Sequence, residues 1–246
     1  MNRLPHGWAV ANLEARISAH VHAWDKAKGR NEPLVPELLP FITISREYGC
    51  EGLALSLHLQ DILNLRCKPF FPWVAYDNEL LSKVARELNL ARNVVEAVDG
   101  KRRSEMSEFF DAILNRHIDD TLVVRKLAEV IRSLAIHGHA IILGRGSYHI
   151  TQDLKNGLHI RLVAPQAWRV AKISADRNLS QHDAEKIAIE GECGRTRYLE
   201  TFFNHDVAHP FHHDLIIDNS RFNLAQITEI VFTALSARFG ATLVGS

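Results

Sequence analysis

The sequence predicts an α/β fold in which a parallel sheet of about five strands is flanked by helices. Short apolar runs with the length of strands alternate along the chain with longer segments that have helical spacing. The strand-like runs are apolar almost throughout, which is typical of parallel strands that helices cover on both faces. With 246 residues, 46% of them hydrophobic, the chain is long enough to bury a sizeable core.

Residues 1–40 are predicted to form a helical extension ahead of the main domain at 41–246. Between 8 and 27, apolar residues recur with helical spacing at Val10, Leu13, Ile17, Val21 and Trp24. The stretch from 29 to 40 then carries three prolines, which indicates a linker. The amphipathic helix offers an apolar face for a protein partner or for self-association.

The first half of the main domain reads as strand, helix, strand and helix. The apolar run at 41–45 predicts the first strand, and a periodic segment at 51–64 predicts the helix that follows it. The aromatic and apolar run at 70–76 predicts the second strand, and helical spacing then extends from Asn78 to residue 138. Asp77 suits the N-cap of that helical region.

The second half continues the alternation. It contains predicted strands at 140–143, 158–163 and 215–218, and predicted helices from Pro165, at 181–203 and at 223–239. Pro165 suits a first helical turn, because its missing N–H would be unpaired there in any case. A parallel sheet of this kind binds its ligand at the carboxyl ends of its strands.

Composition narrows the classes of function. Lysine plus arginine and aspartate plus glutamate both total 29, so the overall charge favours neither nucleic acid nor an anionic membrane as a partner. The chain shows no apolar run near the roughly 20 residues of a membrane span, and its first residues lack a signal-peptide pattern. Cys50, Cys67 and Cys193 form no paired motif, which suits a reducing compartment. We therefore expect a cytoplasmic protein that binds no nucleic acid and no membrane.

The turn at 45–54 is the most informative segment. It follows the first strand, leads into a helix and contains Gly49 and Gly52. Glycines let successive backbone N–H groups point into one concavity, and the helix that follows directs its positive dipole end to the same place. A complete phosphate-binding loop ends in G-K-[ST], and this turn lacks the lysine. The residues alone fit either a phosphate site or an ordinary strand-to-helix connection.

Several motifs occur in order along the domain. They are Ile42-Thr43-Ile44-Ser45-Arg46-Glu47-Tyr48-Gly49, Tyr76-Asp77-Asn78-Glu79-Leu80, Ile142-Leu143-Gly144-Arg145-Gly146, His159-Ile160-Arg161-Leu162-Val163-Ala164-Pro165, Arg195-Thr196-Arg197-Tyr198 and Asp214-Leu215-Ile216-Ile217-Asp218. In this combination, residues 41 to 240 resemble the cytidylate kinase-like family. The resemblance implies a P-loop kinase fold, with Mg²⁺ and ATP at the first loop and a pyrimidine nucleoside monophosphate in a neighbouring cleft. The implied reaction transfers the terminal phosphate of ATP to CMP or dCMP.

The resemblance also implies roles for individual residues. It places the ATP phosphates on Ser45, Arg46, Gly49, Cys50 and Gly52, the acceptor nucleotide on Asp77 and Arg145, and the transferred phosphate on Arg195 and Arg197 of a mobile lid. Arginines suit these places because they offer a planar fork of donors to phosphate and stabilise the charge that spreads during transfer. Each residue also has a plainer interpretation. Asp77 would be only an N-cap, Arg46 would pair with Glu47 or Glu51, and the other arginines would be solvated.

The loop departs from the family pattern at two positions. Kinase-like members tend to read G-S-G-G-R here, whereas this chain has Glu51 in place of a glycine and Leu53 in place of the arginine. A carboxylate about 4 Å from a phosphate charge costs on the order of 4 kcal/mol at an effective dielectric constant near 20. This cost equals roughly a thousandfold in affinity, unless Glu51 points outward or holds magnesium.

These departures leave a second functional interpretation open. The chain would then be a catalytically inactive module that keeps the kinase fold to sense nucleotides or to bind a protein. A Rossmann dehydrogenase fits less well, because Gly49 and Gly52 do not complete G-x-G-x-x-G and no ribose-binding acid follows at the expected distance.

Two further features of the sequence are candidate sites. The histidine-rich run from His205 to Asp214 has no spacing typical of a closed zinc site, and Pro210 interrupts it, so we expect a connecting loop and no protein-bound metal. Cys50 lies at the predicted N-terminus of a helix, where it would either have a lowered pKa and be reactive or serve as a small residue in a tight turn.

Overall fold

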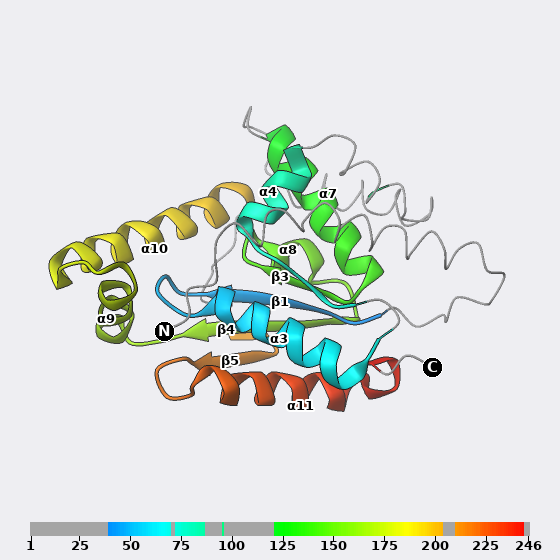
Figure 1. The fold of residues 1–246 in the computed structure, drawn as a ribbon. Helices are drawn as coiled ribbons and strands as arrows, with labels where there is room; N and C mark the ends of the chain where they lie inside the picture. The colour runs from blue at the N-terminus through cyan, green and yellow to red at the C-terminus, as the bar shows by residue number, and fades with distance from the viewer. Residues whose placement is uncertain (1–38, 70–71, 87–94, 96–120, 204–209, 244–246) are drawn as a thin grey trace.

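The computed structural model describes residues 39–69, 72–86, 95, 121–203 and 210–243. The predicted helical extension therefore lies outside the described residues, apart from its last two positions. The described chain forms one five-stranded sheet with helices on both sides (Figure 1), which confirms the predicted α/β class and the strand number.

The sheet is parallel throughout, in the order β2-β3-β1-β4-β5. Its strands are β1 (Phe41–Arg46), β2 (Val74–Tyr76), β3 (Ala140–Leu143), β4 (Gly157–Val163) and β5 (Leu215–Asp218). The central strand β1 pairs with β3 through Ile44 and Leu143, and with β4 through Ser45 and Arg161. The loops that follow β1, β3 and β4 consequently meet at one edge of the sheet.

Two hydrophobic clusters enclose the sheet. Ile42 and Ile44 of β1 pack with α3 (Gly52–Cys67) and α11 (Leu224–Leu243) on one face. Phe41 packs with α4 (Asn78–Arg86) and α7 (Thr121–His137) on the other. Neighbouring residues of β1 point to opposite faces, so a strand covered on both sides must be apolar throughout. This arrangement explains why the strands read as continuous apolar runs.

Two helices leave the sheet at its carboxyl edge. They are α9 (Gln166–Arg177), which follows β4, and α10 (Gln181–Phe203), and Figure 1 shows both projecting beyond the strands. The bounds of α10 agree with the predicted helix at 181–203. Within the described residues, no helix combines the length and the apolar character needed to cross a bilayer.

The structure differs from the sequence prediction in three places. Strand β2 is shorter than the predicted 70–76, and Pro72, which has no N–H for a strand ladder, precedes it. A short helix, α8 (Ser147–Thr151), was not predicted. The histidine-rich run contains a 3₁₀ helix, Pro210–His212, ahead of β5.

Helix α8 is fastened to α7 by a buried arginine. Arg132 donates hydrogen bonds to the Ile150 carbonyl at 2.8 Å and to both carboxylate oxygens of Asp153 at 2.8 and 2.7 Å. Its side chain is only 6% exposed. Because α8 directly follows the turn after β3, this fastening also holds that turn in place.

Replacing Arg132 by Met is expected to lower the free energy of unfolding by about 2 kcal/mol, because three charge-assisted hydrogen bonds are lost. Urea denaturation would measure the change. Arg125→Met on the same helix is the matched control, since Arg125 forms a more exposed pair with Glu129 at 3.6 Å. An equal loss in both variants would contradict this role for Arg132.

Candidate functional site

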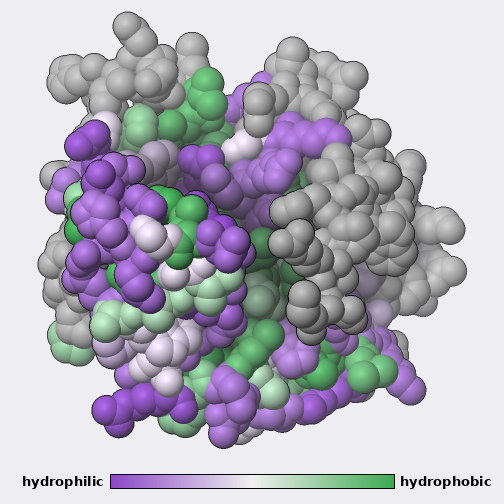
Figure 2. Space-filling model, turned by 60° about the vertical axis from the view of Figure 1, so that its left-hand side comes forward, coloured by the Kyte–Doolittle hydropathy of each residue, from purple (hydrophilic) through white to green (hydrophobic). Residues whose placement is uncertain are grey.

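A cleft of about 420 Å³ opens at the carboxyl edge of the sheet. The turns after β1 and β3, strand β4, helix α10 and the 3₁₀ helix region all contribute to its lining, which includes Ser45, Arg46, Gly144, Arg145, Arg161 and Arg195. Figure 2 views the molecule from the end where α9 and α10 project, and hydrophilic side chains make up much of that face. Four arginines line this one cleft, which makes it the strongest candidate for an anion site.

Arg46, Arg145 and Arg195 act on one another electrostatically. Burial, together with the positive charges of Arg195 and Arg145, lowers the pKa of Arg46 to about 9, while Glu192 and Asp77 oppose the shift. Burial also lowers the pKa of Arg195. With a pKa of about 9, Arg46 remains protonated at neutral pH, and the three arginines outnumber the two carboxylates that oppose its shift. An anion that enters the cleft would relieve this repulsion.

The turn after β3 directs Arg145 into the cleft. Gly144, Arg145 and Gly146 have φ angles of 71°, 57° and 69°, so three successive residues are left-handed. Glycine is required on both sides, because a Cβ would lie 2.2 Å from Arg46 Nη1 at Gly144 and 2.4 Å from the Phe203 ring at Gly146. The Arg145 guanidinium lies over the Tyr198 ring, 5.7 Å from its centre.

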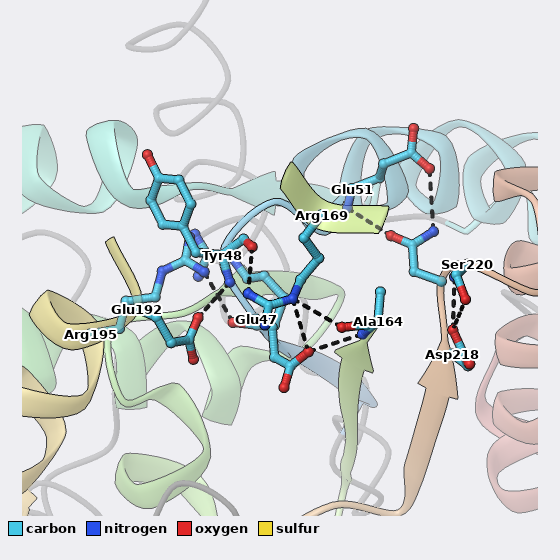
Figure 3. A network of polar contacts seen from close by, with 11 residues as sticks. Glu47, Tyr48, Glu51, Ala164, Arg169, Glu192, Arg195, Asp218 and Ser220 are labelled. Carbon is cyan, nitrogen blue, oxygen red and sulfur yellow. Dashed lines mark hydrogen bonds and ion pairs between the residues drawn. The ribbon is translucent and has the colours of Figure 1, made fainter. Parts of the chain in front are cut away.

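Helix α10 reaches the turn after β1 through a set of close contacts. Arg195 donates to the Arg46 carbonyl at 3.1 Å and lies 4.7 Å above the centre of the Tyr48 ring. Glu192 accepts a hydrogen bond from the Tyr48 backbone N–H at 2.6 Å (Figure 3). Arg197, the other predicted lid arginine, is exposed and is not among the residues that line the cleft.

The turn after β1 is braced from α9 (Figure 3). Arg169 donates to the carbonyls of Tyr48 and Ala164 at 3.0 and 2.9 Å, and its Nε lies 3.4 Å from Glu47. Gly49 has φ of 98°, and a Cβ there would lie 2.9 Å from the Arg169 Cβ. Since Glu47 pairs with Arg169, the interpretation that Arg46 is neutralised by Glu47 is wrong.

Glu51 turns toward α9 and the end of β5. Its carboxylate lies 3.0 Å from Lys172 Nζ and accepts from Asn219 Nδ2 at 3.2 Å, and its backbone N–H donates to Asn219 Oδ1 at 2.8 Å. The pairing with Arg46 is therefore wrong for Glu51 as well. Lys172 partly neutralises the carboxylate, so the repulsion expected between Glu51 and a phosphate is reduced.

The turn is a poor match for magnesium. Both Glu51 oxygens already have hydrogen-bonding partners, and Ala54 has no oxygen at the place where the complete motif carries a hydroxyl. The alternative that Glu51 holds magnesium is therefore not supported.

Three of the phosphate contacts predicted in this turn lie outside the cleft lining. Gly49, Cys50 and Gly52 form the bend itself, and Ser45 and Arg46 are the only predicted phosphate contacts from this turn that line the cleft. Of the two alternatives for Cys50, the reactive thiol is wrong, because burial, reinforced by the charge of Glu47, raises the pKa of its thiol to about 12. The thiol is therefore protonated, and Cys50 serves as a small residue in a tight turn.

Asp77 is the N-cap of α4, which is the plainer of the two roles predicted from the sequence. Its Oδ1 accepts a hydrogen bond from the Leu80 backbone N–H at 2.8 Å, which caps α4. Its charge also raises the pKa of Arg46, so the carboxylate lies near the arginine cluster without lining the cleft. The capping role and a role beside the acceptor site are compatible.

The described part of the histidine-rich run borders the same cleft. His212 and His213 contribute to the lining, and Tyr148 of α8 lies against both rings, 5.0 and 5.4 Å from their centres. Among the described residues, no group of three or more His, Cys, Asp or Glu side chains is placed to hold a metal ion. Residues 205–209 of the run lie outside the described residues.

Sequence reasoning missed three residues that the structure adds to the site. Tyr48 and Glu192 connect the turn to α10, and nothing local in the sequence indicates that positions 144 residues apart meet. Arg161 also lines the cleft, and it did leave a signal, because it is a charged residue within the apolar run that forms β4.

Comparisons with known proteins identify the family and the fold of this chain. The sequence profile of the cytidylate kinase-like family matches residues 41–221. A solved structure of an uncharacterized protein from Eubacterium ventriosum has a TM-score of 0.64 at 16% identity, over 82% of this chain and 100% of that one. A candidate fructose transport system kinase from a Silicibacter species is 18% identical over 80% of this chain and 98% of that one. Its TM-score of 0.34 is too low to indicate a shared fold. No curated protein matches the chain.

Proposed function

The chain belongs to the cytidylate kinase-like family, and from this premise we propose that it is a phosphotransferase acting on a nucleoside monophosphate. In the proposed reaction, a phosphate oxygen of CMP or dCMP attacks the terminal phosphorus of ATP. The bond from that phosphorus to the bridging oxygen breaks, and ADP leaves. Mg²⁺ would accompany ATP and screen the charge of its phosphates.

The observation that carries the proposal is the convergence of Arg46, Arg145 and Arg195 on one cleft. Phosphoryl transfer needs positioning and positive charge more than it needs covalent help from the protein. Arg145, held by its left-handed turn, would bind the acceptor phosphate. Arg46 and Arg195 would stabilise the charge that develops on the transferred group.

The donor site in this proposal is the N-terminal end of α3. Leu53 and Ala54 are exposed, and their N–H groups belong to the first helical turn, where no intrahelical acceptor exists. These donors and the helix dipole suit a phosphate oxygen. Arg46 would take over part of the charge that the missing lysine supplies in a complete loop.

A prediction follows for the charge beside this donor site. Lys172→Met is expected to weaken ATP binding roughly 3- to 10-fold, because it leaves the Glu51 carboxylate without its cation in a partly exposed position. Isothermal titration would measure the change. The double variant Lys172→Met/Glu51→Gln should restore the affinity. Unchanged ATP binding in the single variant would count against an ATP phosphate near Glu51.

The internal hydrogen bonds of the turn favour a second candidate function. Glu192 and Asn219 already accept from the Tyr48 and Glu51 N–H groups, so part of the turn is satisfied without a ligand. The protein would then use the arginine cleft to bind a nucleotide without turnover, as a sensing or interaction module. CMP binding without any ATP binding would support this candidate.

Isothermal titration with ATP, CMP and dCMP, each with Mg²⁺, tests the proposal. We expect CMP or dCMP to bind at one site and ATP at another, with both sites occupied together. Arg66→Met is a suitable control variant, because Arg66 lies in the last turn of α3, pairs with Glu229 and is 40% exposed. The kinase proposal fails if ATP does not bind to the folded protein.

A further inference from the structure

Arg161 of β4 stands out among the residues that line the cleft. The residue is only 8% exposed, and its side chain makes no hydrogen bond or ion pair with any residue that the structure describes. It lies opposite Ser45 in the register of β1 and β4, and both residues line the cleft. A largely buried, charged side chain that lines a cleft without a protein partner is costly, so its position points to a ligand that is itself an anion.

The charges around Arg161 strengthen this argument. Its described neighbours include Arg195 and His213, and its charge lowers the pKa of each. The adjacent carboxylate, Asp214, is already engaged, since it accepts from the His159 backbone N–H at 2.7 Å and from Arg238 at 2.9 Å. Glu192, the carboxylate among the residues that line the cleft, accepts from the Tyr48 N–H, and neither it nor Asp214 pairs with Arg161.

His213 provides the second component of the subsite. Neither of its ring nitrogens has a hydrogen-bonding partner among the described residues, although both are shielded from solvent. Burial, together with Arg161, lowers the pKa of His213 to about 3, so the ring is neutral at pH 7. A neutral imidazole can donate one N–H to an anion without adding a second positive charge. Tyr148 packs against the ring and limits its movement.

Arg161 lies apart from the Arg145 turn along the sheet edge. Strand β1 separates β3 from β4, so the backbones of the two residues are about two strand spacings, or about 10 Å, apart. A single small anion can contact only one end of the cleft at a time, whereas a ligand with two anionic groups can contact both ends. The cleft volume of about 420 Å³ leaves room for a nucleotide.

We propose that Arg161 and His213 form a second anion subsite, so that the cleft takes an acceptor with a second phosphate, a nucleoside bisphosphate. This substrate class rests on the proposed function, but the subsite itself does not. At the first end, Arg145 binds the phosphate that accepts the transferred group. At the second end, Arg161 pairs with the additional phosphate, and His213 donates a hydrogen bond to it.

The test compares CMP, cytidine 3′,5′-bisphosphate and inorganic pyrophosphate by isothermal titration on the full chain. The wild type should bind the bisphosphate at least about tenfold more tightly than CMP, a modest gain for one buried charge pair. Arg161→Met should remove this gain and leave CMP binding nearly unchanged, and Arg161→Lys should keep part of it. Arg66→Met should behave as the wild type.

A thermal unfolding series guards against misfolding of the variants. Arg161→Met should melt at or above the wild-type temperature without ligand, because a buried unpaired charge has been removed. Pyrophosphate should raise the melting temperature of the wild type by more than that of Arg161→Met, in which only the Arg145 end of the cleft remains for it.

Two results would overturn the subsite. One is equal affinity of the wild type for CMP and the bisphosphate. The other is an equal loss of both ligands in Arg161→Met, which would assign Arg161 to the single acceptor phosphate. If CMP does not bind but pyrophosphate binds through Arg161, the kinase proposal fails while the subsite stands.

Discussion

Replacing Arg145 by Met is expected to weaken CMP binding about 100-fold, or by about 2.7 kcal/mol. Methionine keeps much of the length of the side chain and removes the charge-assisted hydrogen bonds to the acceptor phosphate. The left-handed turn should persist, because Gly144 and Gly146 still flank the residue and a non-glycine side chain already occupies the position. Isothermal titration of CMP would measure the loss.

The controls for this result separate a lost phosphate contact from general damage. Arg66→Met should bind CMP as the wild type does, and Arg145→Lys should recover part of the affinity because it restores the charge without the planar fork. If cytidine, which lacks the phosphate, also binds more weakly to Arg145→Met, the residue acts on the nucleoside and this assignment is wrong.

The second large effect concerns stability in acid. His159 is buried on β4, where its Nδ1 lies 2.8 Å from Thr43 Oγ1. Burial lowers the pKa of His159 to about 4, although Asp214 opposes the shift. An unfolded histidine titrates near pH 6.5, so the unfolded chain takes up protons first as the pH falls. The stability from a neutral His159 is thus complete above pH 6.5 and is lost between pH 6.5 and 4, an effect of about 3 kcal/mol.

Urea unfolding at several values between pH 7 and pH 4 would measure this loss. His159→Gln should show a shallower fall of the unfolding free energy, because it removes the titrating group and keeps a hydrogen-bonding side chain beside Thr43. His182, which is exposed on α10, provides the matched control His182→Gln with an unchanged slope. Equal slopes for the wild type and His159→Gln would refute the assignment.

The sheet was predictable from the sequence because burial on both faces constrains the residues of each strand locally. Residues such as Ile42 and Ile44 must be apolar when helices cover both faces of a parallel strand, so the runs themselves identify the strands. Helix α8 escaped prediction because it has only five residues and begins after three left-handed positions that depend on contacts with Arg46 and Phe203. Such a turn is set by packing between distant segments.

The site was only partly predictable for the same reason. The order of the motifs identified Arg46, Arg145 and Arg195 as candidate site residues. Only the folded sheet shows that they line one cleft and that Arg197 lies outside its lining. The partner of Glu51 is Lys172, which is 121 positions away on α9, and no sequence pattern indicates this pairing. Local reasoning also left the reactivity of Cys50 open, because the sequence does not show that burial outweighs the helix N-terminus in setting its pKa.

CMP-dependent release of ADP from Mg-ATP tests the central claim most directly. The proposed phosphotransferase predicts that ADP forms only when CMP or dCMP is present. It also predicts that Arg195→Met, which loses a charge beside the transferred phosphate, slows release strongly at saturating substrate, while Arg66→Met does not. The account is contradicted if ADP release is the same with and without CMP and dCMP, or if none occurs although ATP and CMP both bind.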